Sequence, residues 1–139
     1  MRIGWQMQRK TLLDDRGSMP VVAAIFAVAF VAALTVVINH HQYLQGLAQA
    51  REVSFNAARA ASQQLDNNTL FNDNEPVIDS GEALLAAEEI VAGYPDASIE
   101  SLDVGGSEIE IVVVVQVNGI LGSKTFESTG RATAVDPNR

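Results

Sequence analysis

Cysteine is absent from the 139-residue chain, and histidine occurs only twice. Without cysteine, disulfide bonds, thiolate metal sites and cysteine nucleophiles are excluded. His40 and His41 are neighbours in the sequence, and consecutive residues of a helix do not share a face, so the pair does not converge on one metal ion or nucleophile. Gly105-Gly106 is explained by a turn, which leaves no glycine-rich phosphate loop. We therefore expect no enzyme, no cofactor and no metal site.

Basic residues are scarce beyond the first part of the chain. Four of the 9 Lys and Arg residues come before position 19, whereas 15 of the 17 Asp and Glu residues come after position 38. The part after position 38 therefore carries a net charge of -10, against -8 for the whole chain. Such an acidic body is repelled by nucleic acid, so nucleic acid is excluded as a partner.

Charge is missing altogether from residues 19–38, and no polar face interrupts this stretch. As a helix it would be roughly 30 Å long, which matches the hydrocarbon core of a bilayer. A cleaved secretion signal is the alternative, but its apolar region would be shorter and would end at a small-x-small site, and the best match, Ala48-Gln49-Ala50, lies too far downstream. The sequence predicts a single-pass protein of the cytoplasmic membrane. The basic residues place the N-terminus inside the cell and the acidic domain outside.

The chain continues in a helical pattern after the predicted span. Small and apolar residues recur at spacings of three and four through residues 43–65. They are Leu47, Ala50, Ser54, Ala58, Ala61 and Leu65. We expect one long helix that starts in the membrane and leaves it. The stripe either covers the protein's own sheet or contacts a neighbouring subunit, and the pattern alone favours neither.

An acidic, Asn-rich loop and a second helix follow. The loop lacks the spacing of a calcium-binding loop. The second helix is expected to start near Asp79, with Glu82 at the spacing of a capping box, and to end at Gly93 and Pro95. Its apolar face is predicted to contain Ala83, Leu84, Ala87, Ile90, Val91 and Tyr94.

Three β-strands are expected in the last third of the chain. Gly105-Gly106 separates two of them as a hairpin, and residues 124–135 supply the third. Ile109, Ile111, Val113, Val115 and Val117 alternate onto one face of the middle strand. Val112 and Val114 interrupt the polar face, which suggests a middle strand partly covered on both sides. Ile120 and Leu121, in the following loop, either pack back onto the sheet or form a candidate contact patch.

The predicted fold is therefore α+β. A long N-terminal transmembrane helix continues into an amphipathic helix and is followed by a helix and a small antiparallel three-stranded sheet. The expected division is 1–18, a cytoplasmic leader-like segment; 19–38, the transmembrane helix; 39–65, an extracytoplasmic helix; and 66–139, a small α+β extracytoplasmic domain.

The order of these segments resembles the TadE/TadG-like pseudopilins of tight-adherence (Flp-type) pilus systems. The resemblance rests on Asp15-Arg16-Gly17-Ser18 before the span, on the sequence ARAASQQL after it, and on the Val-rich strand and STGRATAV near the end. It implies a membrane-held minor subunit of a pilus or related secretion apparatus, with the lipid bilayer, other pilus or secretion-system subunits and a prepilin peptidase as partners. The alternative is a signal-anchored extracytoplasmic binding or substrate-delivery protein with no role in a filament.

The same resemblance implies a cleavage site. Gly17 matches the leader glycine that a prepilin peptidase cuts in this family, and Ser18 would become the first residue. Met1 or Met7 is the start of the uncut chain. Many members carry Glu at the fifth mature position, where this chain has Val22. Such a Glu is thought to neutralise the free amine of a neighbouring subunit, so its replacement removes one docking preference.

Overall fold

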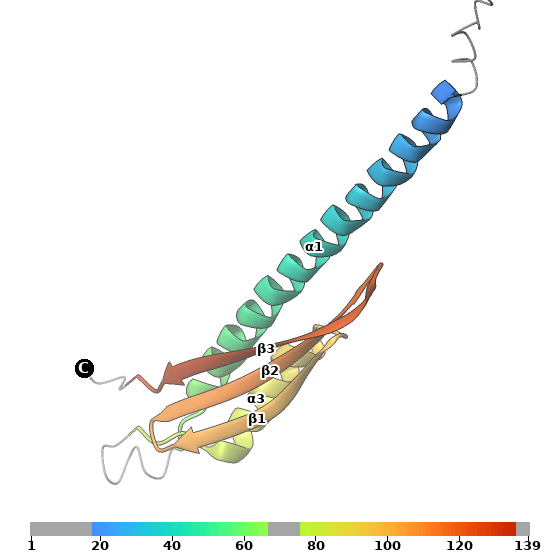
Figure 1. The fold of residues 1–139 in the computed structure, drawn as a ribbon. Helices are drawn as coiled ribbons and strands as arrows, with labels where there is room; N and C mark the ends of the chain where they lie inside the picture. Colours follow the sequence, from blue (N-terminus) through green and yellow to red (C-terminus); the bar gives the residue numbers. More distant parts are fainter. Residues whose placement is uncertain (1–17, 67–75, 136–139) are drawn as a thin grey trace, which may run out of the picture. The chain divides into compact units, whose positions relative to one another are not determined.

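The computed structural model describes residues 18–66 and 76–135 and has the predicted α+β fold. Its elements are α1 (Ser18–Ser62), α3 (Ser80–Ala92), β1 (Ala97–Gly105), β2 (Glu108–Gly119) and β3 (Gly122–Thr133) (Figure 1). The three strands form one antiparallel sheet in the order β1-β2-β3. The predicted meander, with β2 in the middle, is therefore confirmed.

The N-terminal half of α1 is a helix whose side chains lie in the open. Its aliphatic and aromatic residues, among them Ile25, Phe26 and Phe30, are all well exposed. The helix is long and apolar enough to cross a membrane, and none of its most apolar stretch is buried by the rest of the protein. It is compatible with a single-pass membrane anchor, because a helix that is apolar all round needs lipid or another protein around it.

The C-terminal half of α1 belongs to the core of the sheet domain. Five small or branched side chains of α1 are completely buried there: Ala50, Val53, Ala57, Ala58 and Ala61. The small-residue stripe thus covers the protein's own sheet, which was one of its two interpretations. The helix ends at Ser62, before the predicted end at residue 65. Leu65 instead pairs with Ile78 in an isolated antiparallel bridge.

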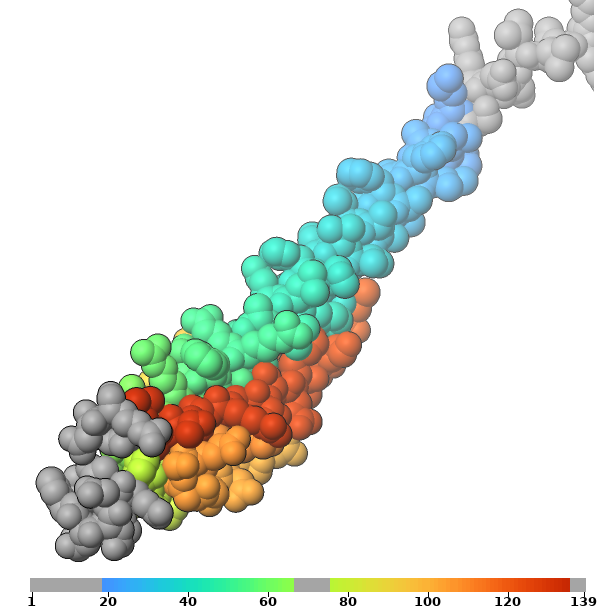
Figure 2. Space-filling view, turned by 90° about the vertical axis from the view of Figure 1, so that its left-hand side faces the viewer, coloured from blue at the N-terminus to red at the C-terminus, as the bar shows by residue number. Residues whose placement is uncertain are grey.

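The sheet buries one face. Ile109, Ile111, Val113 and Val115 of β2 are at most 1% exposed, and their cross-strand partners supply the rest of this face. The β1–β2 turn is closed by Gly106, whose φ of 70° favours glycine. Figure 2 shows β3 lying along the green part of α1.

The opposite face of the sheet is less buried. Val112 and Val114 are half-buried there, which agrees with a middle strand partly covered on both sides. The core cluster, with side chains from α1, α3 and the sheet, lies on the other face, and we call the less buried face the open face. Glu110 and Arg131 form a cross-strand ion pair at 2.8 Å on this open face. Because both side chains are substantially exposed, the pair contributes little stability.

Helix α3 begins and ends where the sequence predicts. The Asp79 carboxylate accepts hydrogen bonds from the backbone N–H groups of Gly81 and Glu82, at 2.8 and 3.1 Å, and Gly93 caps the C-terminus. The reciprocal half of a capping box is not made, because the Asp79 N–H donates to the carbonyl of Gln64 instead. Leu84 was expected on the buried face, but it is 40% exposed.

Candidate functional site

Asn39, the residue that follows the predicted span, is hydrogen-bonded to the tip of the β2–β3 hairpin. The side-chain oxygen of Asn39 accepts a hydrogen bond from the backbone N–H of Leu121, at 3.2 Å. Asn39 is only 7% exposed although it lies next to a fully apolar helix segment. A Cβ atom on Gly119 would overlap the same oxygen, so any larger residue there would displace the Asn39 side chain from this position. Asn39 thus links the chain at residue 39 to a turn more than eighty residues later.

One helical turn further along α1, Tyr43 makes the second link to this hairpin. Its hydroxyl donates a hydrogen bond to the carbonyl of Gly122, at 3.2 Å. Its ring lies 5.9 Å from the Phe126 ring, in a tilted arrangement that aromatic pairs favour. The Lys124 amine lies 5.5 Å from the centre of the Tyr43 ring and 5.4 Å from that of Phe126. These distances allow cation–π attraction to both rings.

Gly46 lets α1 and the hairpin come this close. The residue is buried, and a Cβ atom on it would overlap the side chain of Val117 and press against the Phe126 ring. A glycine inside a helix costs about 1 kcal/mol relative to alanine. At Gly46 the absence of a side chain allows the hairpin to lie directly against the helix. The sequence alone gave no such reason for this glycine.

Ile120 and Leu121 form the turn of this hairpin and do not pack back onto the sheet. They are 59% and 63% exposed. The structure therefore leaves both apolar side chains available for contact, as one of the two sequence interpretations expects. What they contact stays a prediction.

The two histidines lie beside this junction and point outward. His40 and His41 are both exposed, and the amide of Gln45 lies 3.0 Å from Nε2 of His41. Within residues 18–66 and 76–135, no group of three or more His, Asp or Glu residues is placed to hold a metal ion.

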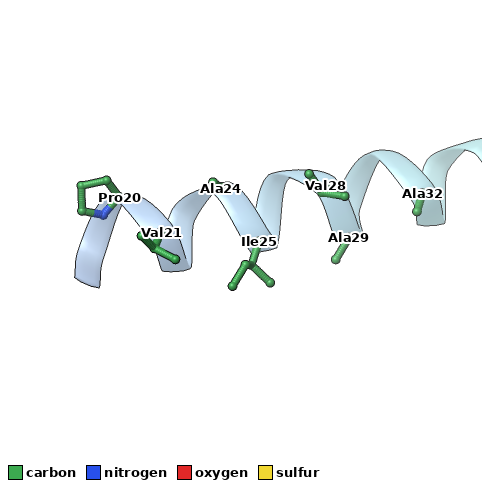
Figure 3. A pocket seen from close by; sticks show the side chains of 7 residues that line it. All are labelled: Pro20, Val21, Ala24, Ile25, Val28, Ala29 and Ala32. Carbon is green, nitrogen blue, oxygen red and sulfur yellow. The ribbon is translucent and has the colours of Figure 1, made fainter. Parts of the chain in front are cut away.

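The exposed half of α1 presents an apolar surface of its own. A shallow strip runs along one side of the helix (Figure 3) and is lined by Pro20, Val21, Ala24, Ile25, Val28, Ala29 and Ala32. Alanines are interspersed among branched side chains, which permits close approach of a second helix or of lipid chains.

Val22, where many of the pseudopilins that this chain resembles carry Glu, is 48% exposed on this helix. Ser18 is the first residue of α1. Gly17, the other half of the expected cleavage site, lies outside the described residues.

Sequence reasoning missed Asn39, Tyr43 and Lys124 as parts of one junction. A signal existed for Asn39, the first polar residue after the span. Its partner, however, is a backbone group of a distant turn, which no local pattern reveals. Comparisons of the chain with models of protein families, with curated proteins and with solved structures found no match.

Proposed function

We propose that this protein is a membrane-anchored minor pseudopilin or assembly subunit of a Flp/Tad-type pilus or a related secretion apparatus. It acts without catalysis, by holding a small folded domain at the cytoplasmic membrane and by contacting other subunits. The N-terminus lies in the cytoplasm and residues 39–139 lie outside the cell.

The observation that carries the proposal is the difference in burial between the two halves of α1. One uninterrupted helix has an exposed, uncharged first half, whereas its second half supplies five fully buried side chains to the core of a small sheet domain. The described residues of this chain leave the apolar side chains of the first half uncovered, so lipid or other helices surround it. A helix shared in this way between bilayer and domain suits a subunit that assembles laterally in the membrane.

The charge pattern supports the orientation. Arg2, Arg9, Lys10 and Arg16 precede the span, and the next basic residue after it is Arg51. Positively charged flanks stay on the cytoplasmic side. The resemblance of the segment around Gly17 and Ser18 to a prepilin leader supports cleavage there. Because Val22 replaces the Glu of many members, we propose a minor position in the assembly and not that of the repeated filament subunit.

A crosslinking experiment in native membranes tests this proposal. A photoreactive amino acid at Val28, on the apolar strip of α1, should crosslink to pilin-like subunits or to membrane proteins of the secretion machine, identified by mass spectrometry. The same group at Ser98, on the open face of β1, is the control for random contact. Crosslinks from position 28 to lipid alone, in cells that assemble the apparatus, would favour the signal-anchored binding protein instead.

A further inference from the structure

The β2–β3 turn carries two aliphatic residues where hairpin turns usually carry Asn, Asp or Gly. Ile120 and Leu121 stand between Gly119 and Gly122 and expose most of their surface. Single exposed apolar residues are common on protein surfaces. Two adjacent ones at the end of a projecting hairpin require a more specific reason, because neither packs onto the domain that carries it.

The position of this turn along the chain supplies that reason. Leu121 is hydrogen-bonded to Asn39, which directly follows the uncharged residues 19–38. Contacts of the hairpin with α1 move steadily toward that end of the helix: Gly130 lies against Ser54, Phe126 against Gly46, Gly122 against Tyr43 and Leu121 against Asn39. The hairpin therefore runs back along α1 and ends where the helix changes from polar to apolar.

The residues around the turn are of types that occur often at membrane interfaces. Tyr43 and Lys124 have apolar bodies and polar ends, which is the type of side chain favoured at the level of lipid headgroups. Lys124 is the only basic residue between Arg59 and Arg131. In a domain whose net charge is negative, a positive charge thus lies two residues after Gly122, next to the turn in the sequence.

We infer that the β2–β3 turn inserts Ile120 and Leu121 into the headgroup–acyl boundary of the bilayer, as a second membrane contact beside α1. The inference rests on the membrane anchoring in the proposed function. Because Asn39 and Tyr43 fix the hairpin to α1, insertion of the turn holds the sheet domain against the membrane surface. The domain is then presented to other subunits in one orientation.

Depth-dependent fluorescence quenching tests this inference on the full chain. The protein has no cysteine, so single variants carry one environment-sensitive NBD label each: Leu121→Cys or Ile120→Cys at the turn, Val28→Cys in the span, and Thr129→Cys on the exposed face of β3. Each is reconstituted into vesicles of phosphatidylethanolamine and phosphatidylglycerol. The lipids carry bromine either near the headgroup end or near the far end of the acyl chains.

We expect the labels at 120 and 121 to be quenched several-fold more than the label at 129, and more strongly by the shallow than by the deep bromine. The label at 28 should be quenched best by the deep bromine. If 28 is quenched and both turn labels behave like 129, the inference is wrong while the anchoring stands. If 28 is also unquenched, the anchoring fails and the inference falls with it. Turn labels that are shielded from water but not quenched indicate a protein partner, which also contradicts lipid insertion.

Discussion

Replacing Gly130 by alanine tests whether α1 and the sheet are packed as tightly as the contacts indicate. Gly130 is buried in β3, opposite Ile111 of β2. A Cβ atom added there would overlap the backbone carbonyl of Ser54 and come within 3.0 Å of the Phe55 nitrogen. These are backbone atoms of a helix, so no side-chain rotation relieves the clash. Either β3 or the helix has to move.

The expected change in the free energy of unfolding follows from two opposing effects. Forcing one extra carbon into a well-packed core typically costs about 1–3 kcal/mol, and more where backbone has to shift. Alanine in a strand recovers about 0.5–1 kcal/mol, because glycine loses more chain entropy on folding. A shift of the helix would also stretch the hydrogen bond between the Ser54 and Ser128 hydroxyls, now 3.1 Å long. We expect Gly130→Ala to destabilise the domain by about 1–3 kcal/mol.

Pulse proteolysis across a urea series measures this on the full chain in mild detergent. Gly105→Ala is the matched control, because its Cβ would meet only the Glu108 carbonyl at 3.9 Å, an ordinary contact. The control should leave the urea midpoint unchanged or raise it slightly. A Gly130→Ala protein as stable as Gly105→Ala would refute the close approach of β3 to α1.

Three further predictions concern the core, the orientation and the helix–hairpin junction. Val113→Asp should destabilise the domain by several kcal/mol, because Val113 is fully buried, whereas Val114→Asp on the half-buried open face should cost much less. Equal urea midpoints would contradict this difference in burial between the two faces. Alkaline phosphatase fused after Arg139 should be active, because the enzyme folds only outside the cytoplasm, and activity of a cytoplasmic reporter alone would reverse the orientation. Gly46→Leu should lower the urea midpoint through its clash with Val117, while Ala48→Leu, at an exposed position of the same helix, should not.

The strands and helices follow from local patterns, and the sequence predicts them well. Alternation from Ile109 to Val117, the Gly105-Gly106 turn and the Asp79 cap each depend on neighbouring residues only. The three-stranded order also follows, because short connections leave β2 between its two neighbours. Even so, the pattern placed Leu84 inside, since periodicity alone does not fix the width of a buried face.

The tertiary contacts of the hairpin were beyond the sequence. Asn39 reads as a polar residue at the end of a span, and only the fold brings the Leu121 backbone to it. Gly46 and Gly130 carry no local signal of their role, because each permits a close approach to an element that is distant in the sequence. Val112 and Val114 predicted partial cover on a second face and are half-buried there, but apolar residues do not reveal whether a neighbouring strand or a helix shields them.

Intact-mass measurement of the protein from its native membrane, with the prepilin peptidase present, tests the proposed pseudopilin function most directly. We expect a chain that begins at Ser18, and a Gly17→Leu variant that stays at full length. A native chain that still begins at Met1 or Met7 would contradict processing, and would favour a plain signal-anchored protein over a pilus subunit.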